Sequence, residues 1–511
     1  MKEYNFIAGT LGLIMLCVTL LSCSNEVVTS QSSYGDLGLN EVIWKPDGGG
    51  NNGGGTTTPC RLTATSTACP GTGGGTNTGG ELVISGSKHC SWLDAGHRHT
   101  IFVKEDSLND PNKIVTVRGL NAHGQLVKDP LYYGSPIAPA MKTDLEWPAG
   151  EVPIMLSGHR RHVCYQFNKT GQVKCYGEDG NKAPVLGDNS GQILDGTHSY
   201  QSLKITAGRN HNAMLLADGR ITTWGSNAWG QLGTGDAYVD GAGIQEYSNA
   251  VTYLKTKDSN GNVSVPTDWV NVAAGHYHTC GIRDNAVWCA GKNDKGQTGN
   301  KNYTIETIDD GNGKYVFSGL PSMTDLSFAK KVEGLENPVI VDAGESHTCA
   351  IQKNGLVKCW GENDYGQLGD GTTSGDIVIV DPTSPVTVLK EDGSKLLAKA
   401  LTLGEETSCA IDIEDNLLCW GRALHMSQGS NNNSPRLVAT PVAGATNVKQ
   451  ADITWHHLTW LTNGGKVYGQ GQNSNQQLRD GNTDDIGTAI ELFTSASITS
   501  REHGLMRTYN W

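Results

Sequence analysis

Residues 343–369 read AGESHTCAIQKNGLVKCWGENDYGQLG, and this phrase recurs along the chain. An eroded seventh copy covers about residues 454–478, and the other five begin at Gly96, Gly158, Gly208, Gly275 and Gly404. Successive copies lie about 50–70 residues apart, a spacing typical of stacked or radial arrays of one supersecondary unit. One such unit cannot bury its apolar face alone, so neighbouring copies must pack against one another. The phrase therefore decides the architecture.

Each copy predicts a β-hairpin. Polar and apolar residues alternate over 347–351 and 356–360, with the turn residues 353–355 between them. Residues 339–342 and 366–369 are expected to supply further strands. Short strands with almost no helical periodicity predict an all-β fold, either a β-solenoid or a β-propeller. The long repeat and its aromatic and glycine punctuation favour the propeller, whose blades leave only short edges exposed.

The combined pattern A-G-x-x-H-T-C … V-x-C-W-G-x-N-x-x-G-Q-L-G resembles the regulator-of-chromosome-condensation repeat family. The resemblance covers about residues 92–511 and implies a seven-bladed β-propeller. Two copies depart from the pattern, since Thr407 replaces the usual histidine of copy six and copy two has an extra residue before His162.

The two ends of the repeat region offer a way to close the ring. Residues 499–506 resemble the first half of a further copy, and residues 80–86 resemble a second half. A C-terminal strand that paired with an N-terminal strand would remove two open sheet edges. An eighth, split blade and a clasp on seven blades are both compatible with this pattern.

The cysteines predict disulfides within the repeats. Wherever one cysteine of a repeat is missing, its partner is missing too, as in Ile101 with Val117, Ala213 with Thr223 and Thr459 with Gly469. Such joint presence is expected of facing side chains on antiparallel strands, which come within disulfide reach. The pairs are Cys164/Cys175, Cys280/Cys289, Cys349/Cys359 and Cys409/Cys419. Buried free thiols are the alternative, while zinc is disfavoured because the spacing lacks C-x₂₋₄-C.

Disulfides imply an oxidising compartment. Three further cysteines follow the leader and precede the first repeat. Cys60 and Cys69 are predicted to pair within the linker, which leaves Cys90 without an assigned partner.

The N-terminus resembles a bacterial lipoprotein leader. Its apolar stretch, residues 6–21, is too short to span a membrane comfortably and ends in Leu20-Leu21-Ser22-Cys23, which resembles a lipobox. The resemblance implies a signal peptide over 1–22, lipidation of Cys23 and, because Ser24 is not acidic, the outer membrane. An ordinary secretory leader is the alternative.

The segment that follows is predicted to be a flexible tether. Residues 23–79 are rich in Gly, Ser, Thr and Asn, a composition that cannot bury a core. The propeller is then assigned to residues 80–511. A lipid at one end, a spacer and a rigid disc predict a protein displayed at the bacterial cell envelope.

Composition argues against several function classes. The net charge is −13 and there is no basic run, whereas nucleic-acid binding needs clustered Lys and Arg. One histidine recurs at a single repeat position, which predicts a repeated structural hydrogen bond rather than a catalytic site, at His99, His162, His211, His278, His347 and His457. Trp224, Trp360 and Trp420 are predicted to pack between blades. No cofactor and no catalytic residue are predicted.

One loop partly matches a calcium-binding pattern. Residues 480–491 place oxygen ligands at Asp480, Asn482, Asp484 and Glu491. The sixth position is Asp485 instead of glycine, and the repeat itself explains the first half of the match. The sequence therefore offers these four residues only as a calcium candidate and assigns no metal.

Unequal insertions between the repeats indicate the function. They cover residues 127–150, 236–268, 301–338 and 373–399, and such insertions map to loops that often form the binding face. They carry the aromatic residue types that dominate protein interfaces, namely Tyr132, Tyr133, Tyr247, Tyr253, Tyr303, Tyr315 and Phe317. The prediction is a non-catalytic protein-binding module for an unknown protein partner.

Two other function classes are alternatives to this prediction. One is an enzyme, or an inhibitor of an enzyme, that acts on an envelope or secreted ligand. The other is guanine-nucleotide exchange on a small GTPase, the best-known activity of the family. An exported lipoprotein would not meet a cytosolic GTPase, so exchange is the least favoured of the three.

Overall fold

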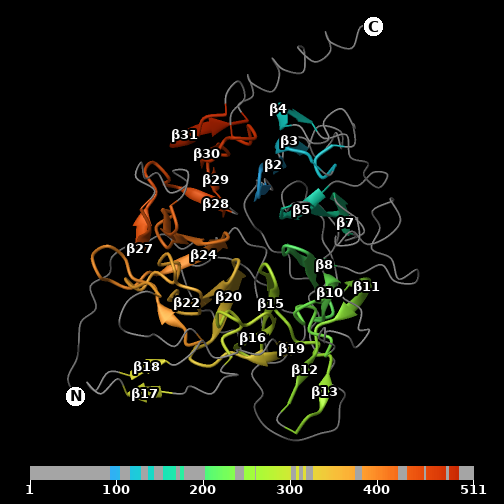
Figure 1. Ribbon diagram of the computed structural model, residues 1–511. Helices are drawn as coiled ribbons and strands as arrows, with labels where there is room; N and C mark the ends of the chain where they lie inside the picture. The colour runs from blue at the N-terminus through green and yellow to red at the C-terminus, as the bar shows by residue number, and fades with distance from the viewer. Residues whose placement is uncertain are drawn as a thin grey trace, which may run out of the picture.

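The computed structural model describes residues 92–103, 115–122, 124–127, 136–142, 153–160, 162–167, 173–177, 202–235, 247–258, 260–300, 307–309, 315–317, 326–374, 383–423, 434–453, 456–478 and 483–493. All regular elements in these ranges are β-strands, which form seven antiparallel blades arranged around one axis (Figure 1). The predicted all-β, seven-bladed β-propeller is confirmed. The segments 80–86 and 499–506, on which the clasp or eighth blade depended, lie outside the described residues.

Each blade is a meander whose strands follow one another from the axis outward. The strands of the first three blades are β1 (Trp92–Gly96), β2 (His99–Val103), β3 (Val115–Leu120) and β4 (Pro136–Lys142) in blade 1; β5 (Pro153–Gly158), β6 (His162–Phe167) and β7 (Val173–Gly177) in blade 2; and β8 (Ser202–Ala207), β9 (His211–Leu216), β10 (Ile221–Ser226) and β11 (Tyr247–Tyr253) in blade 3.

Blade 4 contains β14 (Asn271–Ala274), β15 (His278–Arg283), β16 (Ala286–Gly291) and β19 (Leu326–Lys331). The last three blades contain β20 (Pro338–Ala343), β21 (His347–Gln352), β22 (Val357–Gly361) and β23 (Val386–Thr387); β24 (Ala398–Leu403), β25 (Thr407–Asp412), β26 (Leu417–Gly421) and β27 (Arg436–Pro441); and β28 (Val448–Ile453), β29 (His457–Thr462), β30 (Val467–Gly471) and β31 (Ile486–Leu492).

Two insertions add strands outside this plan. The connection that leaves blade 3 forms a hairpin of β12 (Thr256–Lys257) and β13 (Val263–Ser264), and β12 pairs in parallel with β19 of blade 4. Blade 4 thereby becomes a six-stranded sheet. In the connection between β16 and β19, β17 (Thr307–Asp309) pairs with β18 (Tyr315–Phe317).

The register of the central hairpins agrees with the cysteine pattern. Cys349 faces Cys359, and the three other predicted pairs face each other in the same way. The positions without cysteine also face each other, as Ile101 and Val117 show. In the structure each of the four cysteine pairs forms a disulfide inside its own blade, at Cys164–Cys175, Cys280–Cys289, Cys349–Cys359 and Cys409–Cys419.

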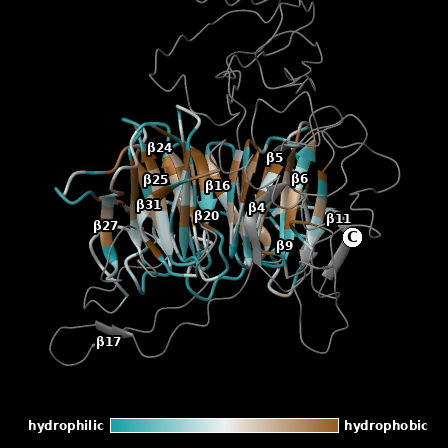
Figure 2. Ribbon diagram, turned by 90° about the horizontal axis from the view of Figure 1, so that it is seen from above, coloured by the Kyte–Doolittle hydropathy of each residue, from teal (hydrophilic) through white to brown (hydrophobic). Residues whose placement is uncertain are grey.

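The core lies between neighbouring blades. Trp360 of blade 5 is fully buried among Cys280, Val287 and Cys289 of blade 4, and its indole Nε1 donates to the backbone oxygen of Gln297 at 3.0 Å. Trp420 packs from blade 6 onto blade 5, and Trp224 from blade 3 onto blade 2. The predicted packing of the tryptophans between blades is confirmed. Seen edge-on, hydrophobic residues fill the strands and hydrophilic ones gather in the loops of both faces (Figure 2).

The repeated histidine forms the predicted structural hydrogen bond, across the seams between blades, at five of its six positions. His99 is the exception, because neither of its ring nitrogens has a hydrogen-bond partner among the described residues. In five blades its Nε2 meets a polar side chain of the following blade. These contacts are His162–Asn212 Oδ1 at 3.0 Å, His211–Thr279 Oγ1 at 2.9 Å, His278–Thr348 Oγ1 at 2.9 Å, His347–Ser408 Oγ at 2.8 Å and His457–Thr100 Oγ1 at 3.3 Å.

Copy six, which lacks the histidine, also lacks a polar partner for one in the following blade. Its Thr407 would have to bond across to blade 7, where the equivalent position is Leu458 and offers no polar atom. Thr407 Oγ1 instead donates to the backbone oxygen of Arg422 at 2.6 Å. An apolar neighbour alone does not dictate this change, because blade 1 keeps His99 although the equivalent position of blade 2 is Val163.

The glycine of the phrase is required by close packing at the same seams. A Cβ on Gly344 would lie 2.3 Å from Cε1 of His347 and 2.5 Å from the backbone oxygen of Gly404 in the next blade. A Cβ on Gly275 would lie 2.3 Å from His278 Cε1 and 2.5 Å from Gly344 O. Separations this short are not found for real Cβ atoms, so the blades can converge on the axis only with glycine here.

Candidate functional site

The innermost strands are joined around the axis by side chains that bond to the next blade. At six of the seven seams, an Asp, Ser or Thr oxygen accepts a backbone N–H from the following innermost strand. The bonds are Gly158 N to Asp94, Ala207 N to Ser157, Ala274 N to Thr206, Leu403 N to Asp342, Ile453 N to Thr402 and Ala95 N to Asp452, at 2.6–3.2 Å. The last of these joins blade 7 to blade 1, whose strands lie side by side in Figure 1.

These groups surround a polar cavity of about 100 Å³ on the propeller axis, which we call the axial cavity. The carboxyl groups of the buried Asp94 and of the half-buried Asp342 and Asp452 line it. Burial raises the pKa of Asp94 and of Asp342 to about 6, although each accepts a backbone hydrogen bond. Burial, and then the charge of Asp94, raise the pKa of Asp452 well above its usual range. The cavity is therefore a place where carboxylates lack sufficient positive partners.

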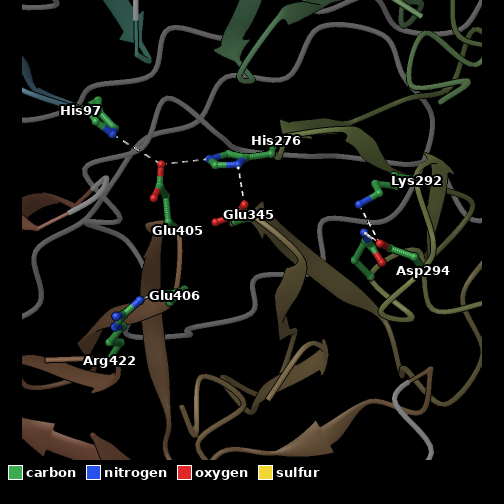
Figure 3. A network of polar contacts seen from close by, with 9 residues as sticks. His97, His276, Lys292, Asp294, Glu345, Glu405, Glu406 and Arg422 are labelled. Atoms are coloured by element: carbon green, nitrogen blue, oxygen red, sulfur yellow. Dashed lines mark hydrogen bonds and ion pairs between the residues drawn. The ribbon is translucent and has the colours of Figure 1, made fainter. Parts of the chain in front are cut away.

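A cluster of imidazole and carboxylate groups lies where the innermost strands end (Figure 3). We call His276, Glu345 and Glu405 the His–Glu cluster; they come from blades 4, 5 and 6, each one residue after the repeat glycine. His276 Nδ1 lies 3.3 Å from Glu345 Oε1, and His276 Nε2 lies 3.5 Å from Glu405 Oε1. On the other side of Glu405, His97 Nε2 is 3.7 Å from the same oxygen. All three cluster residues also line the axial cavity.

Burial sets the protonation of this cluster. Burial, followed by the charge of Glu345, raises the pKa of Glu405 to about 8, although Arg209 and Arg160 oppose the shift. Burial also lowers the pKa of His276, and it lowers the pKa of His97 to about 2 with help from Arg98 and Arg160. Burial alone would raise the pKa of Glu345, but His276 and Arg209 outweigh it and lower that pKa.

Aromatic and charged side chains from the same blades form contacts near the cluster. Lys292 Nζ lies 2.6 Å from Asp294 and 5.2 Å from the ring centre of Trp229, whose indole is 39% exposed. Between blades 5 and 6, the Arg422 guanidinium lies 4.4 Å from the ring centre of Tyr365. Arg422 also pairs with Glu406 (Figure 3). The ring contacts tie blade 3 to blade 4 and blade 5 to blade 6.

Few of the predicted interface residues have described side chains. Tyr253 is half-buried against the core between blades 2 and 3, with the Arg220 guanidinium 4.4 Å above its ring, so it packs within the fold. The side chains of the other six, Tyr132, Tyr133, Tyr247, Tyr303, Tyr315 and Phe317, lie outside the described residues, although Tyr247, Tyr315 and Phe317 are placed in β11 and β18.

The calcium candidate lies partly, and the leader wholly, outside the described residues. Glu491 lies in β31, and its carboxylate is 2.9 Å from Lys466 Nζ. Asp484 is described, whereas Asp480 and Asn482 are outside the described residues, as are Cys23, Cys60, Cys69 and Cys90. The part of the chain that the structure describes holds no helix of the length and hydrophobicity that a membrane span requires.

The His–Glu cluster was not predicted from the sequence, because it lies at a repeat position where the copies differ. The residue after the repeat glycine differs from blade to blade and reads His97, His159, Arg209, His276, Glu345 and Glu405 in the first six. Variation in polar residue type at this position, which faces the axis in the repeat, is the sequence signal that points to these residues.

Comparison with known proteins agrees with this architecture. The family described as Regulator of chromosome condensation (RCC1) repeat matches residues 203–231, 269–297 and 339–367, which are the inner three strands of blades 3, 4 and 5. The chain therefore carries RCC1 repeats.

Two curated relatives match more than half of the chain in sequence. The ultraviolet-B receptor UVR8 of Arabidopsis thaliana is 27% identical over 310 residues, which are 60% of this chain and 62% of UVR8. The E3 ubiquitin-protein ligase HERC2 of Homo sapiens is 26% identical over 311 residues, 58% of this chain and 6% of HERC2. The match thus spans less than two thirds of either relative.

Solved structures show the same fold at low identity. Human WBSCR16 has a TM-score of 0.56 and 16% identity, covering 72% of this chain and 86% of its own. Prp20p of Saccharomyces cerevisiae has a TM-score of 0.56 and 15% identity, covering 80% and 88%. The chain is accordingly similar to RCC1-like propellers.

Proposed function

We propose that this protein is a protein-binding propeller held at the bacterial cell envelope, in the outer membrane, by a lipid on Cys23 and the tether 23–79. Its partner would be another protein, bound through the insertions between blades, and the disc itself would not be catalytic. The RCC1-like fold supports the general role, since the homologous Prp20p has been studied for binding to Gsp1p and histones and crystallised with Kap60.

The observation that carries the proposal is the β12–β13 hairpin. It extends blade 4 outward, and its outer strand exposes Val263 by 50% and the adjoining Val265 by 37%. A projecting sheet edge offers unpaired backbone groups to which an extended protein segment can bind, and the exposed apolar side chains on it add apolar contacts. The lipobox-like residues 20–23 support the anchoring part.

The test compares envelope proteins that co-purify with the lipidated chain and with a variant in which Val263 and Val265 are both changed to Ser. A matched control is Ile413→Ser, which removes an apolar side chain 44% exposed on the β25–β26 turn of blade 6. We expect one protein to be recovered with the wild type and the control and to fall about 10-fold with the double variant, as for loss of a contact worth about 1.4 kcal/mol. Equal recovery with all three chains would contradict the role of the hairpin.

A further inference from the structure

The His–Glu cluster has the donor types of a metal site. His276 is buried, and neither of its ring nitrogens has a hydrogen-bond partner of acceptable geometry. Buried polar atoms of folded proteins are almost always hydrogen-bonded or bound to an ion or water, so this imidazole requires an explanation. Its two nearest polar neighbours are the carboxylates of Glu345 and Glu405, and the three side chains converge from separate blades.

The distances are compatible with a small divalent ion. One donor atom from each of His276, Glu345 and Glu405 lies within 4.8 Å of the other two. Zinc binds imidazole nitrogen at about 2.0–2.1 Å and carboxylate oxygen at about 2.0–2.2 Å, so donors of a tetrahedral site stand about 3.3–3.6 Å apart. Small rotations of the two glutamate side chains would bring the donors to that separation.

We propose that His276, Glu345 and Glu405 bind one divalent transition-metal ion of the zinc class at the end of the axial cavity. One imidazole and two carboxylates suit zinc, whereas magnesium and calcium favour sites made of oxygen alone. Three protein ligands leave a fourth position for water or for a ligand donor from outside. His97, at 3.7 Å from Glu405 Oε1, holds the outer side of that carboxylate.

Some of the surrounding charges oppose the binding of a cation, and others favour it. Arg160 and Arg209 lie close enough to influence His276 and Glu405 and would weaken the binding of a cation. The carboxyl groups of Asp94, Asp342 and Asp452 line the cavity beneath, and Lys204 influences Asp342. The imidazoles of His97 and His159 are buried, which lowers both pKa values and keeps them uncharged near neutrality. With the two cluster glutamates, five carboxyl groups face this part of the axis.

Such an ion would hold neighbouring blades together at the axis and would not contact the insertions. It would join the ends of β14, β20 and β24 at the axis. Among the described residues, the seam between blades 4 and 5 lacks the bond found at the other six, in which a side-chain oxygen accepts a backbone N–H of the following innermost strand; instead Asn271 Nδ2 donates to Val339 O at 3.3 Å. This inference is independent of the protein-binding role, because that role depends on the outer edge of blade 4.

The proposal is tested by zinc titration of the full mature chain, purified without a polyhistidine tag and freed of metal with a chelator. Calorimetry should show one Zn²⁺ per chain, and X-ray absorption should show a single imidazole with oxygen ligands. Glu405→Gln and His276→Gln should each weaken binding at least about 10-fold. Glu406→Gln is the matched control, since it removes a neighbouring carboxylate that pairs with Arg422, and it should bind as the wild type does.

A second measurement separates ligand loss from misfolding. Zinc that binds only the folded chain raises its melting temperature, and this rise should occur in the wild type and Glu406→Gln and disappear in Glu405→Gln. Either Glu405→Gln or His276→Gln could fail to fold, which would show as loss of the near-ultraviolet circular dichroism of the wild type. Glu345→Gln then replaces that variant, because the Glu345 side chain is more exposed, at 31%. The proposal is overturned if the wild type binds no zinc, if the ligand variants bind it normally, or if the control loses it equally.

Discussion

The carboxylate of Asp452 in blade 7 accepts a hydrogen bond from the backbone nitrogen of Ala95 in blade 1, at 2.6 Å. In the described residues these two blades share no strand, so the ring is closed there by side-chain contacts. Gln450 adds to this seam, since its amide donates to Leu93 O at 2.8 Å. The closure therefore depends on a few residues of β28 that face β1.

The first prediction concerns this closure. Asp452→Ala leaves the buried Ala95 N–H without its acceptor, and we expect the free energy of unfolding in urea to fall by about 1–3 kcal/mol. Asp452→Asn is the matched control, because the amide oxygen of asparagine can still accept the hydrogen bond from Ala95 N and the side chain does not titrate. Equal destabilisation by both variants would show that the bond to Ala95 is not what Asp452 contributes.

The second prediction concerns pH. The pKa of Asp342 is about 6 in the folded protein, against about 3.9 in the unfolded chain. The folded state therefore binds more protons between these values, so the contribution of Asp342 to stability is greatest below about pH 4 and is lost as the pH rises through about 6. Asp342→Asn should flatten this part of the pH profile and stabilise the protein at pH 7 by about 1–3 kcal/mol.

Urea unfolding at several pH values measures this effect. Glu333→Gln, a change at a side chain that is 82% exposed, serves as the control and should leave the profile unchanged. An Asp342→Asn profile that falls as steeply as the wild type between pH 4 and 6 would contradict the prediction.

The third prediction concerns the histidine seam. Ser408 Oγ donates to Gln367 O at 2.9 Å, so it must accept from the Nε2–H of His347, which fixes a neutral tautomer. Burial lowers the pKa of His347 to about 3, in agreement with that state. A double-mutant cycle of His347→Ala and Ser408→Ala should give a coupling energy of about 0.5–1.5 kcal/mol. Strict additivity of the two changes would mean that the contact does not stabilise the seam.

The fourth prediction concerns the disulfides. Peptide mapping without reduction should recover Cys349 linked to Cys359, and the other three pairs linked within their own blades. Replacing one pair by alanines should lower the free energy of unfolding by about 2–3 kcal/mol under oxidising conditions, through the loop that the bond closes. The same replacement should matter far less after full reduction. Links between blades, or free thiols at these eight positions in the protein purified from its native cells, would refute the prediction.

The fifth prediction concerns anchoring. Cys23→Ser should yield a folded propeller that no longer fractionates with membranes, because the proposed tether adds nothing to the core. One acyl chain binds membranes only marginally, so stable attachment needs the several chains that lipoprotein processing supplies. Membrane fractionation after a salt wash measures the result. A Cys23→Ser chain that stays with the membrane would place the anchor elsewhere.

Features that repeat could be predicted from the sequence because equivalent positions can be compared between the copies. Cys349 and Cys359 were assigned to facing positions because Ile101 and Val117 lack cysteine together. The expected strand at residues 366–369 is wrong for a local reason. Gly366 and Gly369 have φ values of 77° and 70°, and Gly369 N donates to Gly366 O at 3.0 Å, so this segment is a tight turn. The outer strand of the blade is Val386–Thr387.

The His–Glu cluster depends on convergence that no single copy encodes. His276 and Glu345 occupy equivalent positions in neighbouring blades, and their approach follows from the narrowing of the disc toward its axis. The register of one hairpin contains no information on that distance. Only the ring as a whole brings a histidine of one repeat within 3.5 Å of a glutamate two blades away.

The pairing of Thr256 with Ala329 gives the ring unequal seams. Because β12 leaves blade 3 and ends as an outer strand of blade 4, these two blades are interlocked at their rims as well as packed at their faces. Blade 4 cannot swing away until that parallel pairing is broken. Blades 5 and 6 are joined in a similar way, because Lys390 forms a parallel bridge with Ala439. Breathing motions of the disc, and the first steps of its disassembly, would therefore begin at the other seams, and these two pairs of blades would separate late.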